Sequence, residues 1–402
     1  MSSPTTSILV KVGVKGLMIS FILICFLLTL ILMPSLFAKS VFTATPALNR
    51  HMHFPVTFAY LLSASKGDVH SLNRTLTALY HPANQYLLHL DFKATPEEHS
   101  LLSHIVLSNP VFTQFGNVKI VEKPNLVTYR GPTMLAATLH GMAILLRCCR
   151  WDWFINLSAS DYPVVTQDDL IVAFSNLPRN LNFIQHSRLL GWKIKKRARP
   201  IIIDPGLYSI NESEIIWSSE QRSLPTAFKL FTGSAWTIIS RSFAEYMVLG
   251  WENLPRTLLI FYTNFISSAE GYFQTVVCNS EYKNTTVNHD LHYITWDNPP
   301  KQHPLYLGLK DYRRMILSSA PFARKFKKND PVLDKIDREI LRRHKGQFTY
   351  GGWCLVGKSR SCSGGVEGVK RFSLRPGAGS RRLKALLSKM LSDKYFRRRQ
   401  CK

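Results

Sequence analysis

The first half of the chain alternates short apolar runs with amphipathic segments. The runs are bounded by Pro, Gly and polar residues, which predicts buried strands, and the segments between them carry apolar residues at helical spacing. Strands that alternate with helices predict an α/β fold with a mostly parallel central sheet. The expected strands lie at residues 54–64, 86–91, 118–121 and 153–157, and the expected helices at residues 69–79 and 133–146.

An uncharged apolar segment occupies residues 16–38 and is long enough for a membrane-spanning helix, which needs about 20 residues. Lys11 and Lys15 precede it, which favours a cytoplasmic N-terminus. A cleaved signal peptide is the alternative, but the run exceeds the usual length of about 7–15 apolar residues and no A-x-A site follows. We therefore expect a type II membrane protein with a cytoplasmic tail (1–15), a signal-anchor, a stem (39–53) and a lumenal domain.

The chain is strongly basic, with 51 Lys and Arg against 26 Asp and Glu and a formal net charge of +25. Such an excess of positive charge indicates a negatively charged partner: nucleic acid, an anionic membrane surface or an anionic substrate. A lumenal domain excludes nucleic acid as the partner. Residues 356–402 are rich in Gly, Ser and basic residues, with a short amphipathic helix expected at 381–391. This predicts a globular domain over 54–355 and a poorly ordered basic tail that can contact an acidic polysaccharide. Truncation after residue 355 is then expected to leave a folded enzyme.

A single acidic residue, Glu270, stands between a small-residue run and the apolar segment GYFQTVV. A lone carboxylate in such surroundings is a candidate general base. It also fits a helix start, with Ser267 or Ser268 as N-cap and Glu270 in the first turn. From composition alone, the helix-cap interpretation is favoured.

Several ordered motifs change that balance: FAYLLSASKGD, YLLHLDFKA, VTYRGPTML, WDWFINLSASDYP, SSAEGYFQTVVCNS and TTVNHDLHYITWDNPPKQHP. Together they resemble glycosyltransferase family 14. This family holds the core-2/I-branching N-acetylglucosaminyltransferases, the peptide O-xylosyltransferases and the plant β-glucuronosyltransferases acting on arabinogalactan. The sequences of these motifs are most similar to the plant branch, and the resemblance covers about residues 54–354. The resemblance implies a GT-A-like nucleotide-sugar domain with Glu270 as catalytic base.

The resemblance also implies a donor site. In the family, basic side chains meet the donor diphosphate, and Lys325 in FARKF matches one of them. The position that corresponds to the family's second basic residue is Gln302, which carries no charge. The adjacent Lys301 is therefore taken as the second basic residue. As structural alternatives, Tyr129 packs in the core and Lys325 belongs to a solvated basic run. The donor-binding residues expected are Ala64, Asp91, Tyr129, Lys301 and Lys325.

The nucleotide-binding half contains no D-x-D motif of the kind that holds a metal in GT-A enzymes. Asp161 in SASDYP either makes a turn or ligates a metal, and the turn interpretation is favoured. Asp168 and Asp169 read as a helix start. Since the family's branching enzymes work without a divalent cation, we expect no required cofactor. Activity should survive EDTA, although a Mn²⁺ site on Asp161 or Asp152 is the alternative.

The acceptor site is less defined. Trp296 and Trp192 are candidates to stack on a sugar face, with core packing as the alternative, and Trp236 is expected in the core. A glucuronate donor carries a carboxylate that some Lys or Arg must meet. The sequence does not choose among Arg130, Lys193, Lys195 and Arg199.

Six cysteines follow the apolar N-terminal segment, which permits disulfides in an oxidising compartment but leaves their pairing open. Their spacing does not resemble a zinc site. Asn211 and Asn284 are the more accessible of four N-glycosylation sequons, because the other two fall in an expected helix and strand. The sequons are at Asn73, Asn156, Asn211 and Asn284.

These observations predict an inverting, UDP-sugar-dependent glycosyltransferase of the Golgi membrane. The expected reaction is β-transfer of glucuronate from UDP-glucuronate to galactose of arabinogalactan on a proteoglycan. Transfer of N-acetylglucosamine or xylose is the alternative within the family. A catalytically silent, membrane-tethered binder of acidic glycans is the alternative of another class. Each of these three functions is compatible with complexes between this protein and other Golgi glycosyltransferases.

Overall fold

The computed structural model describes residues 54–208, 212, 214–250, 252–299, 303–354 and 373–402. The expected membrane segment and stem, Lys301 and Asn211 lie outside these residues. Over the described ranges, no helix combines the length and the apolar character that a membrane crossing requires.

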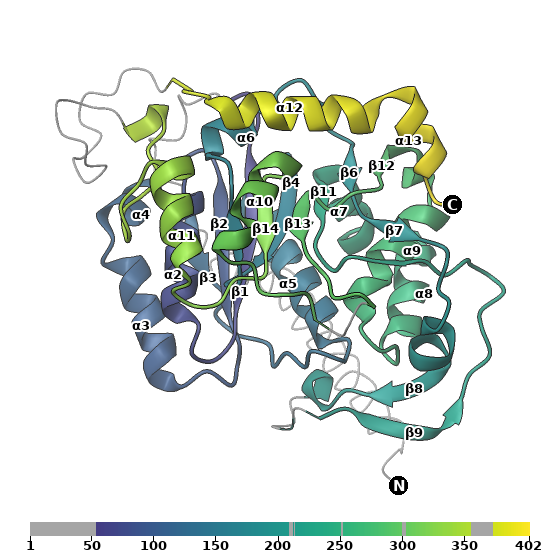
Figure 1. Ribbon diagram of the computed structural model, residues 1–402. Coiled ribbons are helices and arrows are strands. Elements are labelled where there is room, and N and C mark those ends of the chain that lie inside the picture. Colours follow the sequence, from purple (N-terminus) through teal and green to yellow (C-terminus); the bar gives the residue numbers. More distant parts are fainter. Residues whose placement is uncertain (1–53, 209–211, 213, 251, 300–302, 355–372) are drawn as a thin grey trace, which may run out of the picture. The chain divides into compact units, whose positions relative to one another are not determined.

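The described chain is built on a seven-stranded sheet in the order β12-β6-β11-β4-β1-β2-β3 (Figure 1). Strand β1 (Phe58–Ala64) pairs in parallel with β2 (Gln85–Leu90) and β4 (Trp153–Ser158), while β11 runs antiparallel to β4. The prediction of an α/β fold with a mostly parallel sheet is confirmed. The remaining strands of this sheet are β3 (Val118–Ile120), β6 (Asn182–Phe183), β11 (Ile238–Ser240) and β12 (Thr286–Val287).

Alternate residues of β1 enter two different cores, because successive side chains of a strand point to opposite faces. Phe58, Tyr60 and Leu62 pack in one apolar cluster, and Ala59 and Leu61 in the other. Burial on both faces explains why these strands read as continuous apolar runs.

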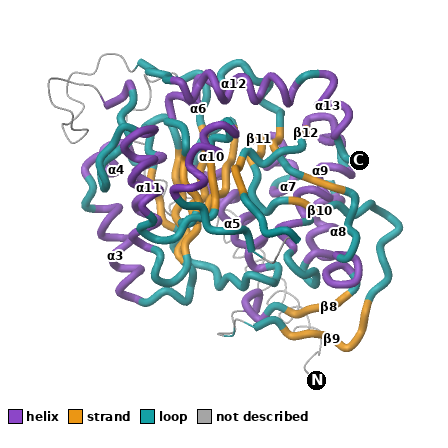
Figure 2. The backbone as a smooth tube through the Cα atoms, viewed as in Figure 1, coloured by secondary structure: helices purple, strands orange, loops and turns teal. Residues whose placement is uncertain are grey.

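Helices cover both faces of the sheet (Figures 1 and 2). Buried residues of α2, α6 and α12 contribute to the first cluster. Those of α5, α7, α8 and α9 contribute to the second. The helices are α2 (Val69–Leu79), α3 (Pro96–Leu107), α4 (Pro110–Phe115), α5 (Thr133–Cys148), α6 (Gln167–Phe174), α7 (Arg241–Val248), α8 (Asn253–Tyr262), α9 (Tyr272–Asn279), α10 (Tyr312–Ser318), α11 (Pro331–Ile336), α12 (Ala378–Leu391) and α13 (Asp393–Arg399).

Smaller sheets bring distant segments together. In the order β13-β14-β5, the central strand β14 places Arg324 opposite Asp161 of β5. The antiparallel pair β8 and β9 forms a hairpin at one end of the domain (Figure 2). These strands are β5 (Asp161–Pro163), β7 (His186–Ser187), β8 (Pro200–Ile203), β9 (Ile216–Gln221), β10 (Thr232–Gly233), β13 (His292–Ile294) and β14 (Phe322–Arg324).

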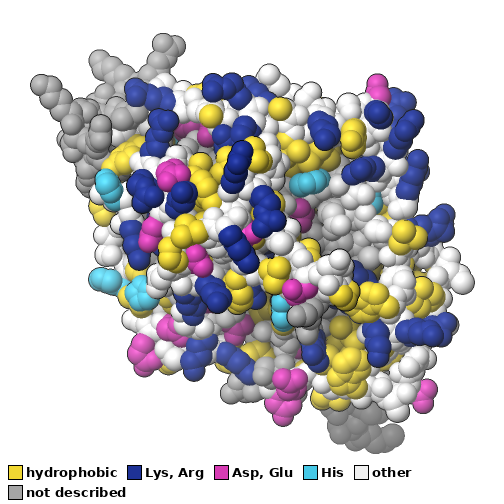
Figure 3. Space-filling model, in the orientation of Figure 1, with side chains coloured by type: hydrophobic (Ala, Val, Ile, Leu, Met, Phe, Trp, Pro, Cys, Tyr) yellow, Lys and Arg dark blue, Asp and Glu magenta, His cyan; other side chains and the backbone are white. Residues whose placement is uncertain are grey.

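The prediction of a poorly ordered tail over residues 356–402 is wrong for residues 373–402, which form α12 and α13; residues 356–372 lie outside the described part of the chain. Leu383 and Leu387 of α12 are 0% and 2% exposed in the core, one helical turn apart. The opposite side of α12 carries exposed Lys and Arg, which gather over this part of the surface (Figure 3). Two well-placed leucines therefore anchor a helix whose composition resembles a solvated segment.

Polar contacts reinforce this packing. Asp168 accepts a hydrogen bond from the backbone N–H of Arg375 at 2.7 Å, and Asp169 accepts those of Gly377 and Ser380 at 2.6 and 3.0 Å. The two acids do begin α6 as predicted, and Asp169 forms a capping box with Thr166. They also hold the segment that leads into α12.

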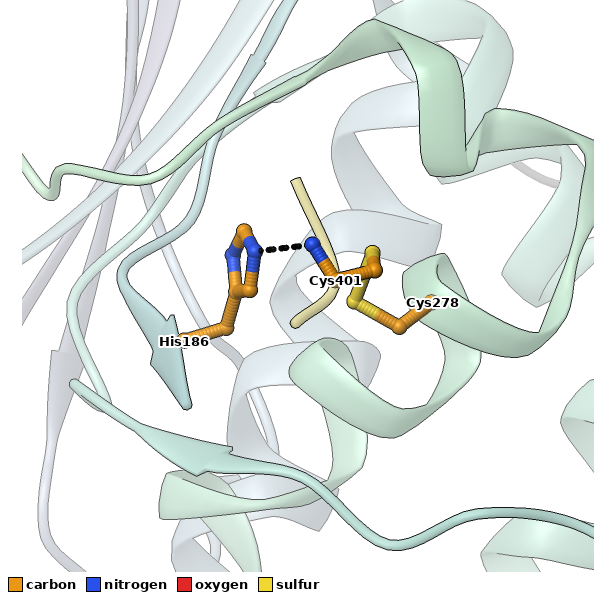
Figure 4. Close-up of side chains that lie close together, drawn as sticks. All are labelled: His186, Cys278 and Cys401. Atoms are coloured by element: carbon orange, nitrogen blue, oxygen red, sulfur yellow. Dashed lines mark hydrogen bonds between the residues drawn. A yellow bond between two sulfur atoms is a disulfide. The ribbon is translucent and has the colours of Figure 1, made fainter. Parts of the chain in front are cut away.

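A disulfide fastens the C-terminal segment to the domain (Figure 4). Cys401 forms a disulfide with Cys278 of α9, and its N–H donates to Nε2 of His186 at 2.8 Å. The side-chain ligand atoms of these three residues are close enough together to bind a metal ion, but both sulfur atoms are bonded to each other in the disulfide. Cys148 and Cys149 form a second disulfide, so the expectation of disulfide pairing is met for these four cysteines.

The structure separates the glycosylation candidates. Asn284 is exposed and Asn73 is half-buried on α2. Asn156, by contrast, is 3% exposed; its amide donates to Ala235 O and accepts from Thr237 N. Asn156 is therefore not a glycosylation site in the folded protein, because its nitrogen is buried and already hydrogen-bonded.

Candidate active site

A cavity of about 300 Å³ opens at the carboxyl ends of β1, β2 and β4. This is where open α/β sheets bind ligands. Four of the five residues predicted to bind the donor line it, and they come from four separate segments. These four are Ala64, Asp91, Tyr129 and Lys325.

Asp91 closes the end of β2 and fixes the loop beside it. Its Oδ1 accepts the N–H of Lys93 at 2.8 Å, and its Oδ2 accepts the N–H of Val127 at 2.9 Å. Since Val127 is two residues from Tyr129, the carboxylate helps to place the aromatic ring at the cavity. Tyr129 is 50% exposed, which excludes the alternative that it packs in the core.

Asp204 is a positioning residue that the sequence did not reveal. Its carboxylate is fully buried and accepts from Thr128 Oγ1 at 2.5 Å and from Thr133 Oγ1 at 2.9 Å. These two threonines flank Tyr129 and the start of α5. A Cβ on Gly131 would lie 1.8 Å from the same carboxylate, so this loop requires glycine there. The segment IIIDPG around Asp204 carries no pattern that would signal this contact across the chain.

His89 also holds the loop that leads to Tyr129 in place. Its Nε2 accepts the backbone N–H of Asn125 at 3.0 Å, and the side chain is 3% exposed. Burial lowers the pKa of His89 from near 6.5 to about 4, against a smaller opposing effect of the Asp91 charge. The ring is thus neutral at pH 7, as acceptance of this hydrogen bond requires.

Acidification should therefore destabilise the domain through His89. The pKa is lower in the folded state than in the unfolded state, so this contribution is complete above pH 6.5 and is lost as the pH falls towards 4. At pH 5 the loss should be about 2 kcal/mol. Urea unfolding of the wild type and of His89→Gln at pH 7 and pH 5 measures it. Equal pH dependence in the two proteins would contradict this account.

Arg324 and Lys325 bring positive charge to the cavity. The Arg324 guanidinium lies 4.0 Å from the ring centroid of Trp236, and its Nη1 is 3.5 Å from Asp161 Oδ1. Lys325 Nζ lies 4.7 Å from the centroid of Tyr306. Trp236 also lines the cavity, so its predicted core position is corrected, and Lys325 does not belong to a solvated run.

Asp161 closes a turn with Ser158, three residues before it, rather than the expected Asx-type turn, in which the side chain accepts from the N–H two residues after it. Its Oδ2 accepts the N–H of Ser158 at 2.5 Å and the Ser158 hydroxyl at 2.8 Å, while Oδ1 faces Arg324. The residue is 1% exposed. A carboxylate already paired with a guanidinium and a serine fits a divalent cation poorly.

Glu270 lies next to this cavity on a short 3-10 turn, Ser268–Glu270, that precedes α9. The helix-cap interpretation holds only in part. Ser267 is the N-cap position of this 3-10 turn and Glu270 lies in its first turn, but α9 begins after Gly271. Neither serine side chain caps a helix, and the Ser268 hydroxyl donates to Tyr262 O and Phe265 O instead. The Glu270 carboxylate forms an ion pair with Arg197. A Cβ on Gly271 would meet the Tyr262 ring at 2.8 Å, so glycine lets the turn approach the helix bundle closely.

Two contacts connect the Glu270 turn to its surroundings. The N–H of Ser267 donates to Arg130 O at 2.7 Å, which joins the Glu270 turn to the Tyr129 loop. Lys193 Nζ donates to Thr232 Oγ1 at 2.9 Å, and Thr232 donates to Glu270 O at 3.2 Å. Burial raises the pKa of Tyr129, and the charge of Glu270 raises it further. Glu270, Tyr129 and Arg197 thus lie within electrostatic reach of one another.

The acceptor candidates lie outside the cavity lining. Trp192 is 64% exposed and the guanidinium of Arg197 lies 5.4 Å from its ring centroid. Trp296 is 46% exposed. Core packing is therefore excluded for both tryptophans, and Trp192 reaches Glu270 through Arg197. The sequence did not single out Arg197 as a partner of Glu270, because the two are distant in the chain.

The arrangement combines three functions in neighbouring positions. A cavity with an aromatic ring and a carboxylate suits a nucleoside. Lys325 and Arg324 offer charge-assisted contacts to phosphates. The half-buried carboxylate of Glu270 lies just outside the cavity lining.

Comparisons with known proteins agree with this site. The family model described as "Core-2/I-Branching enzyme" matches residues 58–316. Beta-glucuronosyltransferase GlcAT14A of Arabidopsis thaliana is 56% identical over 87% of this chain and 78% of its own length. GlcAT14B from the same plant is 56% identical over 86% of this chain and 80% of its own. Human Xylosyltransferase 1 is 27% identical over 70% of this chain and 30% of its own.

Among solved structures, the galactosyltransferase LgtC in complex with donor and acceptor sugar analogues covers 68% of this chain and 88% of its own, at 8% identity. Its TM-score of 0.32 is too low to support a conclusion. The sequence relatives decide the matter. With more than half of its length matched by the family model and over half of its aligned residues shared with two plant relatives, the chain belongs to the Core-2/I-branching enzyme family.

Proposed function

We propose that this protein is an inverting glycosyltransferase of GT-A-like fold that transfers glucuronate from UDP-glucuronate in β-linkage to galactose of arabinogalactan. The observation that carries the proposal is the position of Glu270 beside a cavity lined by Asp91, Tyr129 and Lys325. Two relatives at 56% identity are named β-glucuronosyltransferases, which supports the choice of donor sugar.

The reaction proceeds as a single displacement. Glu270 accepts the proton of an acceptor hydroxyl while that oxygen attacks the anomeric carbon from the face opposite UDP. The bond from the anomeric carbon to the β-phosphate oxygen breaks, and its electron pair leaves with UDP. Lys325 and Arg324 stabilise the charge that builds on the diphosphate. Lys301 is retained as a further diphosphate ligand.

The ion pair with Arg197 keeps Glu270 oriented towards the acceptor side, where Trp192 offers an aromatic surface for a sugar ring. Trp296 is proposed as a second acceptor surface. An aromatic face packs against the apolar face of a pyranose, and the guanidinium can donate to sugar hydroxyls. Both would place an acceptor oxygen within reach of the carboxylate.

A donor screen on the purified domain tests the proposal, with UDP-glucuronate, UDP-xylose and UDP-N-acetylglucosamine against a β-galactan acceptor. Transfer of glucuronate with inversion supports it. Turnover of only xylose or N-acetylglucosamine would assign the protein to another activity of its family. Glycan binding without turnover of any donor would identify it as a binder.

Activity should not depend on a divalent cation. Asp161 is occupied by Ser158 and Arg324, and Lys325 supplies positive charge at the cavity. We expect rates after EDTA treatment to stay within about twofold of the untreated enzyme. A large loss that Mn²⁺ restores, and that Asp161→Asn or Asp152→Asn abolishes, would show that an acid ligates a metal.

We further propose that the protein is a single-pass type II Golgi membrane protein with a lumenal catalytic domain, tethered through residues 16–38. Support comes from the uncharged segment and the two lysines before it. Protease added to intact vesicles should spare the domain. Glycosidase treatment should remove glycan from Asn284, which is exposed.

A further inference from the structure

UDP-glucuronate differs from the neutral sugar donors by one carboxylate at C6. A site that selects it needs a cation beyond those that face the diphosphate, and a guanidinium is the best match to a planar carboxylate. The sequence left Arg130, Lys193, Lys195 and Arg199 open for this role, and the structure distinguishes among them.

Three of these cations are less suitable. Lys193 Nζ donates a hydrogen bond to Thr232, which in turn donates to the backbone of Glu270, and burial lowers the pKa of Lys193. Lys193 therefore helps to hold the Glu270 turn in place. Lys195 and Arg199 are exposed on the turn around residues 194–198. Neither they nor Arg130 line the cavity, but only Arg130 is adjacent in the chain to a lining residue, Tyr129. Of the other cations nearby, Arg197 is already paired with Glu270, and Arg324 is assigned above to the diphosphate.

Arg130 differs in both backbone and side chain. Its carbonyl accepts the N–H of Ser267 at 2.7 Å, and the neighbouring Gly131 fits tightly against Asp204. The backbone is therefore fixed between the Tyr129 loop and the Glu270 turn. The side chain is exposed, and none of the ion pairs between described residues includes it. A fixed base with an unengaged guanidinium suits a ligand contact.

The charge of Arg130 reaches the cavity at His303. This ring lines the cavity and lies 5.0 Å from the ring centroid of Tyr129. Burial lowers the pKa of His303, and the charges of Lys325, Arg324 and Arg130 lower it further. The charges of Arg130, Lys325, Arg324 and Glu270 thus all act on this one ring. The donor's diphosphate and its sugar must both lie in this region.

We propose that Arg130 binds the C6 carboxylate of the glucuronate donor and so selects it over neutral UDP-sugars. Lys325 and Arg324 are left to the diphosphate, and Tyr129 to the nucleoside. Arg130 lies between the nucleoside loop and the base, as the sugar itself must. This assignment rests on the proposed function, because it requires a glucuronate donor.

Arg130→Met tests it, since methionine keeps an unbranched side chain and removes the charge. We expect kcat/KM for UDP-glucuronate to fall by about 10- to 100-fold, the range for a lost hydrogen bond to a charged group. The Kd of UDP and the kcat/KM for UDP-glucose should change by less than about threefold, because neither ligand carries the carboxylate. Arg130→Lys should retain part of the preference, since it keeps the charge without the planar fork.

Lys119→Met on β3 is the matched control, because it removes one exposed cation away from the cavity. It should leave all three quantities unchanged. Equal weakening of UDP and UDP-glucuronate by Arg130→Met would place Arg130 on the diphosphate and overturn the assignment. An unchanged preference for UDP-glucuronate would overturn it as well. A wild-type enzyme that does not use UDP-glucuronate would refute the proposed function before any variant is made.

Discussion

Glu270→Gln is expected to lower kcat by about 10²- to 10⁴-fold, the range for loss of a general base. A sugar hydroxyl is a poor nucleophile near neutral pH, so the displacement needs a proton acceptor within hydrogen-bond reach. Glutamine keeps the size of the side chain and an oxygen for Arg197, but it cannot accept the proton. Single-turnover rates with saturating donor and acceptor measure the effect on the chemical step.

Donor binding and folding should change little in this variant. Glu270 lies beside the cavity rather than in its lining, so the Kd of UDP should remain within about threefold. Glu281→Gln is the matched control, because it neutralises an exposed acid shortly after α9. A folded Glu270→Gln enzyme with near-normal turnover would remove Glu270 from the mechanism. A fall in thermal stability with unchanged kcat would make the residue structural.

Truncation after residue 355 is expected to abolish folding or to lower the free energy of unfolding by at least about 5 kcal/mol, a large part of a typical domain's stability. The deletion removes Leu383 and Leu387 from the core and the disulfide partner of Cys278. It also exposes the buried Asp168 and Asp169 to a surface without their backbone donors. Soluble yield and thermal unfolding of the globular domain with and without the tail measure this.

Point variants separate the contributions. Leu383→Ala should cost about 2–5 kcal/mol through the cavity it leaves. Cys401→Ser should cost about 2–5 kcal/mol through loss of the crosslink. Lys384→Ala changes an exposed residue of the same helix and should stay within about 0.5 kcal/mol. A truncated domain that melts with the full-length one would show that the tail is dispensable.

The sequence was most informative where local pattern and burial agree. Strands β1, β2 and β4 were predicted within a few residues, because both of their faces are buried and their apolar runs are continuous. A turn at Asp161 was also predicted, although its carboxylate bonds back to Ser158 instead of forward along the chain as in an Asx-type turn.

It was least informative where the deciding contact joins distant segments. Arg197 and Glu270 are 73 positions apart, and no sequence pattern near either residue predicts the ion pair between them. Asp204 fixes the Tyr129 loop from a segment without a recognisable pattern. The tail looked solvated because its charges outnumber its leucines, whereas the positions of those leucines determine its packing.

Attachment of the C-terminus to Cys278 and His186 also sets the order of biogenesis. Domains generally fold from the N-terminus while the chain is still being made. Here the Cys278–Cys401 disulfide joins two residues that are 123 positions apart. The helix that follows Glu270 can therefore receive its crosslink only after the segment that carries Cys401 has been made. Folding around this helix is thus completed late in synthesis, and it requires an oxidant that takes up the electrons of the two thiols.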